Sequence, residues 1–188
     1  MRDRIRRKGP GRYRVKLRSN EQLLVRELIG QLREQLLVST DEPHLQRLFP
    51  PAYPDDVERD AGYQVLTRDE LVERKLAALE VVDRTVGGGD VTEEELGAWM
   101  LALNSLRLVL GTRLDVDETI PLLDPDDPEA FAYAVYEYLG ELLHQVVMAL
   151  GDDLPPPSTP DAPGAPGSPG SPGGPGSGPG LGPEPNAN

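Results

Sequence analysis

Residues 92–114 read TEEELGAWMLALNSLRLVLGTRL, a stretch that predicts a long amphipathic helix. Thr92 and Glu95 have the spacing of a capping box, in which each side chain binds the other residue's backbone N–H group at the start of a helix. Apolar residues then recur every three or four positions as far as Leu114, so the helix should run from about residue 93 to residue 112. Because only one face is apolar, other elements must cover that face.

The same periodicity predicts three further long helices, over residues 19–38, 67–86 and 127–151. Capping boxes that begin at Ser19 and Thr67 open the first two of them. Helices that each have one apolar face pack together as a bundle.

The two ends of the chain differ in composition from its middle. The hexapeptide RYRVKL of residues 12–17 alternates basic and apolar side chains, which predicts a short strand with one half-buried face. Residues 152–188 are dominated by proline, glycine and serine, which predicts a disordered tail. The predicted fold is therefore all-α: a helical bundle of about four long helices with a short N-terminal β-strand and a disordered Pro/Gly-rich C-terminal tail. The predicted divisions are a basic N-terminal arm with the strand at 1–18, a helical bundle domain at 19–151 and the tail.

Composition argues against most kinds of catalytic site. The chain has no cysteine and two histidines far apart in sequence, which exclude thiol chemistry and argue against a histidine metal site. The glycine run at 87–89 lacks the Gly-Lys-Ser/Thr ending of a phosphate-binding loop. No serine has a recognisable histidine and acid partner. We therefore expect no enzyme activity, no catalytic residues, no metal and no cofactor.

The N-terminus lacks the apolar stretch of a secretory signal, and no apolar run approaches the roughly 18 residues that span a bilayer. We expect a cytoplasmic protein without a membrane segment.

The charge is distributed unevenly along the chain. Residues 1–18 hold nine of the 19 basic residues and one acid, so they carry +8 while the rest carries −21 of the net −13. Such an arm suits contact with nucleic acid, with another anionic surface or with the acidic body of the chain itself. The candidate nucleic-acid or partner contacts are Arg4, Arg6, Arg7, Lys8, Arg12, Arg14, Lys16 and Arg18.

Charged residues also fall within the apolar faces of the predicted helices. At 100° per residue, Arg107 lies on the same line as Leu103 and Leu110. Lys75 and Glu21 occupy equivalent positions on two other helices. Three inward-facing charges predict a buried polar network.

Two hypotheses explain this network. In the structural hypothesis, which we favour, Glu21 pairs with Arg107 and fixes the packing of the helices, while Lys75 extends to the edge. In the functional hypothesis, Arg107 and Asn104 line a pocket for a phosphate or carboxylate ligand.

Four segments together resemble an actinobacterial family known as a domain of unknown function, one branch of which is the oxidative-stress transcription regulator AosR. The segments are GPGRYRVKLRSNEQLLVRELIGQL (9–32), LQRLFPPAYPDD (45–56), AWMLALNSLRLVLGTRL (98–114) and YEYLGELLHQVVMAL (136–150). The most specific features are Trp99, Asn104, Arg107 and Gly111. The chain departs from the family pattern at Ser105, where an aspartate is common, and in its lack of cysteine.

The resemblance implies a mostly helical intracellular protein. In the characterised branch it implies a transcription regulator that works with a stress sigma factor on genes of cysteine biosynthesis. Family members are often encoded beside the adaptor of the Clp protease. We therefore expect a non-enzymatic transcription or stress-response regulator that acts through protein contacts with a sigma factor, with DNA as a candidate second partner of the basic arm. The alternative is a helical adaptor linked to regulated proteolysis, without DNA binding.

Overall fold

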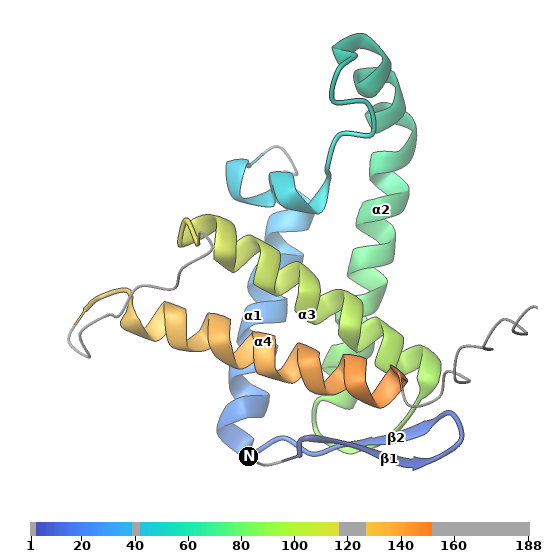
Figure 1. Ribbon diagram of the computed structural model, residues 1–188, viewed down its shortest axis with the longest axis vertical. Helices are drawn as coiled ribbons and strands as arrows, with labels where there is room; N and C mark the ends of the chain where they lie inside the picture. Colours follow the sequence, from blue (N-terminus) through green and yellow to red (C-terminus); the bar gives the residue numbers. More distant parts are fainter. Residues whose placement is uncertain (1–2, 39–41, 117–126, 152–188) are drawn as a thin grey trace, which may run out of the picture. The chain divides into compact units, whose positions relative to one another are not determined.

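Four long helices and one small sheet make up the part of the chain that the computed structural model describes, which is residues 3–38, 42–116 and 127–151 (Figure 1). Their order is β1 (Ile5–Gly9), β2 (Arg12–Val15), α1 (Ser19–Val38), the short 3₁₀ helix η1 (Pro43–Leu48), α2 (Val57–Thr85), β3 (Gly89–Thr92), α3 (Glu93–Arg113) and α4 (Ala130–Gly151). The predicted mainly helical bundle is thereby confirmed. The predicted tail lies outside the described residues.

The helices form two pairs. Helices α1 and α2 contact each other and run in opposite directions, and α3 and α4 lie side by side across them (Figure 1). The sheet lies beside the start of α1, and its strand β1 contacts α4. Each long helix therefore buries one face against at least one other helix.

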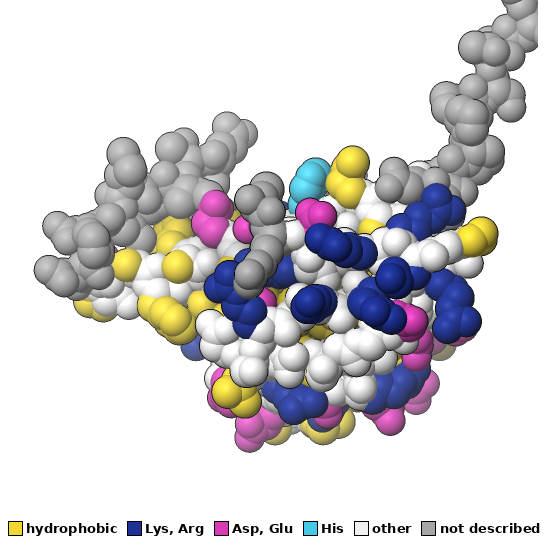
Figure 2. Space-filling view, turned by 90° about the horizontal axis from the view of Figure 1, so that it is seen from below, with side chains coloured by type: hydrophobic (Ala, Val, Ile, Leu, Met, Phe, Trp, Pro, Cys, Tyr) yellow, Lys and Arg dark blue, Asp and Glu magenta, His cyan; other side chains and the backbone are white. Residues whose placement is uncertain are grey.

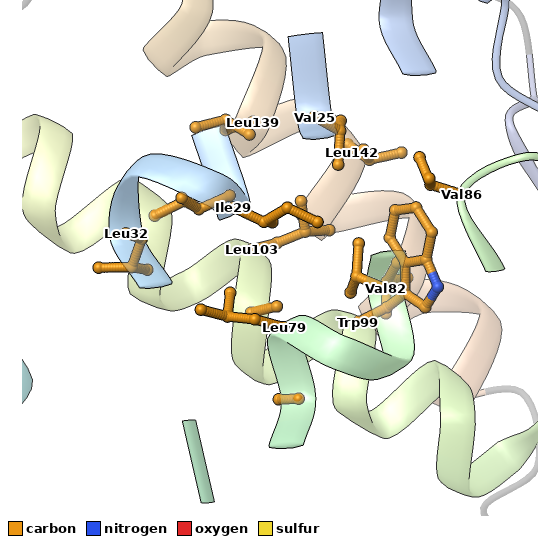
Figure 3. Close-up of a cluster of buried hydrophobic side chains, with 14 of the residues drawn as sticks. Val25, Ile29, Leu32, Leu79, Val82, Val86, Trp99, Leu103, Leu139 and Leu142 are labelled. Carbon is orange, nitrogen blue, oxygen red and sulfur yellow. The ribbon is translucent and has the colours of Figure 1, made fainter. Parts of the chain in front are cut away.

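The core lies where the four helices meet (Figure 3). Ile29 of α1, Leu79 of α2, Trp99 and Leu103 of α3, and Leu142 of α4 are each at most 1% exposed. The indole Nε1 of Trp99 donates a hydrogen bond of 2.8 Å to the Thr85 hydroxyl of α2. Trp99 therefore joins α3 to α2 both by burial and by a satisfied polar atom.

Of the three predicted capping boxes, the one at Thr92 is confirmed. Its hydroxyl accepts the Glu95 N–H at 3.2 Å, and the Glu95 carboxylate accepts the Thr92 N–H at 2.9 Å. This reciprocal pair satisfies two N–H groups that a helix start leaves without partners.

The start predicted at Thr67 is wrong. Helix α2 begins ten residues earlier, where the Asp56 side chain accepts the Arg59 N–H at 3.0 Å. Inside this helix the Thr67 hydroxyl donates instead to the Tyr63 carbonyl at 2.9 Å. The first half of α2 buries little apolar surface, so its sequence carries no amphipathic signal that would have extended the prediction.

Helix α1 begins at Ser19 as predicted, but with a different cap. Glu21 accepts the Arg18 N–H at 2.8 Å, while the Gln22 side chain donates to the Leu17 carbonyl at 3.0 Å. The Glu21 carboxylate, and not the Gln22 amide, caps the start of the helix because a carboxylate is the stronger hydrogen-bond acceptor.

Replacing Thr92 by alanine is expected to lower the free energy of unfolding by about 1 kcal/mol, because the Glu95 N–H loses its acceptor. Urea denaturation measures the change. The matched control is Thr112→Ala near the end of the same helix, where alanine has the higher helix propensity. An equal loss in both variants would show that the cap contributes nothing.

Residues 3–18 belong to the same compact unit as the helices. Strands β1 and β2 form an antiparallel hairpin, and β3 pairs antiparallel with β2 to complete a three-stranded sheet. Tyr13 and Val15 of β2 are at most 1% exposed. The described part of the predicted arm is thus anchored in the core by its apolar side.

The glycine run after α2 has a conformational role. Gly88 and Gly89 have φ values of 99° and 129°, a region that other residues rarely adopt. These angles turn the chain from α2 into β3, which places Asp90 on the sheet beside Arg14.

Candidate nucleic-acid interface

The outer side of the sheet carries a concentration of basic side chains (Figure 2). Alternate residues of a strand point to opposite sides. Because Tyr13, Val15 and Leu17 point into the core, the residues between them point outward. We call the outward set the basic face: Arg6, Lys8, Arg12, Arg14, Lys16 and Arg18, all of them exposed.

The basic face repeats positive charge along and across the hairpin. Arg6 lies directly opposite Arg14 in the strand register. Arg14 Nε donates to Asp90 Oδ1 at 2.6 Å. This hydrogen bond and the charge of Arg14 hold the pKa of the Asp90 carboxyl below its usual value. Asp90 is therefore ionised at neutral pH and offsets part of the charge of Arg14.

A hollow of about 480 Å³ lies on this face. Its lining includes five members of the basic face, Arg4, Leu17 and the acidic residues Asp3 and Glu21. Asp3 is exposed and its carboxylate lies 3.7 Å from Arg6. An exposed pair at that distance neutralises little charge, so the hollow favours an anionic group.

Arg4 is not part of the basic face, which corrects its prediction as a contact residue. Its guanidinium Nε donates to Glu21 Oε1 at 2.9 Å and its Nη1 to Glu141 Oε1 at 3.0 Å. Its backbone N–H donates to the Gln145 side chain at 2.8 Å, and its guanidinium lies 5.2 Å from the centre of the Tyr138 ring. Arg4 therefore fastens β1 to α1 and α4.

Burial near Arg4 also affects two acidic groups. Burial raises the pKa of the Tyr138 hydroxyl to about 12, and the negative charges of Glu21 and Glu141 act in the same direction. Burial raises the pKa of the Glu21 carboxyl as well, but hydrogen bonds from the Arg18 N–H and from Arg4 outweigh this effect and place it below its usual value. At neutral pH the Glu21 carboxylate is charged and faces a charged Arg4.

Arg7 is exposed but lies away from the basic face. It pairs with Tyr13 in the register, so its side chain starts on the inner side of the sheet. There it lines a hollow with His144 and Met148 of α4. The other six predicted contact residues are those of the basic face.

The predicted pair between Glu21 and Arg107 is wrong. The Glu21 carboxylate binds Arg4 and the Arg18 N–H, whereas the Arg107 guanidinium lies 4.5 Å from the centre of the Tyr136 ring. Gly140 leaves the space for it, since a Cβ atom there would lie 3.2 Å from the Arg107 Nε. Arg107 is thus held between α3 and α4 by stacking.

The rest of the predicted buried network does not form either. Asn104 is exposed, and Lys75 is half-buried with its Nζ 5.8 Å from the centre of the Phe49 ring. Burial and the neighbouring Arg74 lower the pKa of Lys75. The buried face of α3 centres on Trp99, Ala102 and Leu106, one residue around the helix from the predicted line. This shift leaves Arg107 at the edge of the buried face and Asn104 on the exposed side.

The hollow next to Arg107 does not support the anion-pocket hypothesis. Glu137 and Glu141 also line it, and their negative charges oppose an anionic ligand. The described residues contain no group of three or more His, Asp or Glu side chains placed to hold a metal ion. None of the described helices is both long and apolar enough to cross a membrane.

These observations define a class of protein. It is a mostly helical domain that carries a basic sheet face on an otherwise acidic chain. The chain belongs to the family described as Domain of unknown function (DUF2017), whose model matches residues 1–150. The resemblance seen in the sequence is thereby confirmed.

Four mycobacterial relatives carry a functional name. The chain is 32% identical over 127 residues to the oxidative stress regulator AosR of Mycobacterium tuberculosis (strain H37Rv) and of Mycobacterium bovis. Each alignment covers 58% of this chain and 58% of the relative, so the match spans little more than half of either protein. No solved structure matches the chain significantly.

Proposed function

We propose that this chain is a non-enzymatic regulator of a stress response that acts in the cytoplasm by binding a sigma factor and DNA. The basic face is the observation that carries the proposal, because it concentrates exposed positive charge on an otherwise acidic chain. The names of the mycobacterial relatives support the regulatory part. Since the chain has no cysteine, any oxidant is sensed by a partner.

The proposal predicts that the response of the native cell to peroxide depends on the basic face. Deleting the gene should change the set of transcripts induced by peroxide, and the wild-type chain should restore it. The variant Lys8→Glu/Arg12→Glu/Lys16→Glu should not restore it, because it reverses three charges of the face.

The control variant Arg47→Glu/Arg74→Glu/Arg113→Glu reverses three exposed charges elsewhere on the surface and should restore the response. RNA sequencing before and after peroxide measures the outcome in the parent strain, the deletion strain and the three complemented strains. A deletion that leaves the peroxide response unchanged would disprove the regulatory function. Equal rescue by both variants would disprove the role of the basic face.

An adaptor that binds a protein of the proteolytic machinery, without DNA, is the second candidate function. The exposed apolar side chains of Val57, Val65 and Leu66 in the first half of α2 favour it, since each is at least 79% exposed. Affinity purification from the native cell discriminates the two functions. An adaptor would retain its protein partners in the charge-reversed variant and would carry no DNA, whereas a regulator that uses the basic face would co-purify with DNA and lose that DNA in the charge-reversed variant.

A further inference from the structure

We propose that the basic face binds the phosphate groups of double-stranded DNA. This inference rests on the proposed function for its biological role, and it adds that the DNA is double-stranded and which residues bind its phosphates. The binding residues are Arg6, Lys8, Arg12, Lys16 and Arg18, with Arg14 partly neutralised by Asp90.

The charge pattern of the basic face lowers the stability of the fold. Like charges directly opposite each other on neighbouring strands are destabilising, and Arg6 faces Arg14 in this way. Within the described residues, Asp90 is the acid that the sheet itself supplies to this side, and it pairs with Arg14. A partner with regularly spaced negative charges would relieve the remaining repulsion, as a phosphate backbone does.

The basic face lacks exposed apolar side chains of the kind that bind protein partners or membranes. Protein interfaces are centred on aromatic or aliphatic anchors, and peripheral membrane binding needs apolar residues that enter the lipid. The apolar residues of β2 and of the segment that follows it, Tyr13, Val15 and Leu17, are buried in the core. The face therefore offers exposed charge, and Leu17, the apolar residue that lines its hollow, is only 6% exposed.

The basic face suits double-stranded nucleic acid better than single strands. Proteins that bind single-stranded nucleic acid stack its bases on exposed aromatic rings. Tyr13, the aromatic residue of the hairpin, is fully buried, so it offers no stacking surface. Double-stranded nucleic acid keeps its bases stacked internally and presents its phosphates outward.

The shape of the hairpin suits duplex DNA better than duplex RNA. The major groove of B-form DNA is about 12 Å wide and admits a two-stranded β-ribbon. The major groove of duplex RNA is too narrow for side chains to enter. The sheet adds the short strand β3 to such a ribbon, and side chains from both strands of the hairpin line the hollow on its outer side.

The face is also held in place before any partner arrives. The Lys16 N–H donates to the Arg4 carbonyl at 2.8 Å, and the Arg4 side chain binds Glu21 of α1 and Glu141 of α4. A strand fastened to two helices loses little conformational entropy on binding. Arg4 is thus a positioning residue for the basic face.

The test measures binding of the full chain to a short fluorescent duplex DNA of mixed sequence by anisotropy, over about 50 to 200 mM salt. If each of the five cations contacts one phosphate, the logarithm of the association constant should fall against the logarithm of salt with a slope of about −4 to −5. The variant Arg12→Ala/Lys16→Ala should reduce this slope by about 2. The control Arg47→Ala/Arg113→Ala makes the same charge change elsewhere and should leave the slope unchanged.

Circular dichroism is the check that both variants fold. Four other probes are tested for binding in the same way. They are single-stranded DNA, duplex RNA, polyglutamate and vesicles of anionic lipid. Binding of any of them at least as tightly as duplex DNA would overturn the inference, and so would an absence of DNA binding at low salt or an equal slope in the two variants. The peroxide response tests the proposed function separately, because a regulator that acts through protein contacts alone would pass that test and fail this one.

Discussion

Replacing Trp99 by alanine is expected to lower the free energy of unfolding by about 3 to 5 kcal/mol. The ring is fully buried and lies in the same core cluster as Val82, Val86 and Leu142 (Figure 3). Alanine would leave a cavity there and would also remove the donor that bonds to the Thr85 hydroxyl. Urea denaturation followed by far-ultraviolet circular dichroism measures the change.

The neighbouring residue supplies a control. Met100 is 40% exposed on the same helix, so Met100→Ala should change the free energy of unfolding by about 0.5 kcal/mol or less. A Trp99→Ala loss as small as that of Met100→Ala would mean that the indole does not fill the junction of α2 and α3.

Replacing Glu21 by glutamine is expected to lower the free energy of unfolding at pH 7 by about 2 kcal/mol. The side chains of Arg4 and Glu21 are 17% and 11% exposed, and the carboxylate also caps α1 through the Arg18 N–H. Glutamine keeps the shape but loses the charge, which leaves Arg4 in a largely buried site with weaker acceptors.

The same substitution should remove part of the acid sensitivity of the protein. Because the pKa of Glu21 is lower in the folded chain than its ordinary value of 4.5, the carboxylate stabilises the fold fully above that pH. Its contribution is lost as the pH falls through the folded pKa. Wild type and Glu21→Gln should therefore differ most at neutral pH and converge in acid.

Urea denaturation between neutral and acid pH tests this expectation. Glu34→Gln is the control, because Glu34 is exposed on the same helix. A constant difference between Glu21→Gln and wild type at all pH values would show that Glu21 does not titrate as expected.

The helices could be predicted from sequence wherever an apolar face is long. Helices α1, α3 and α4 bury side chains at helical spacing along most of their length, and their predicted limits agree with the structure to within a few residues. The first half of α2 and the strands β1 and β3 escaped prediction for the same physical reason. Ile5 in β1 and Val91 in β3 are the one buried residue of each strand, which is too little for a periodic pattern.

The basic residues of the candidate site were predicted, but their sorting was not. Arg4 and Arg6 are both arginines two positions apart, yet the first joins three elements and the second faces outward. Glu141 and Tyr138 lie more than 130 residues further along the chain, so no local pattern reveals that they contact Arg4. The prediction that Arg107 is buried was wrong for a local reason. The buried face of α3 is rotated by about one residue from the predicted face, and this rotation places Arg107 outside the core.

The burial of Trp99 also determines what the intrinsic fluorescence of this protein reports. The whole chain has one tryptophan, and that residue lies at the junction of α2 and α3. Indole emission therefore follows the opening of a single junction, while ellipticity follows all four helices. Coincidence of the two transitions would establish that the domain unfolds as one cooperative unit, and earlier loss of the emission signal would identify this junction as the first to open.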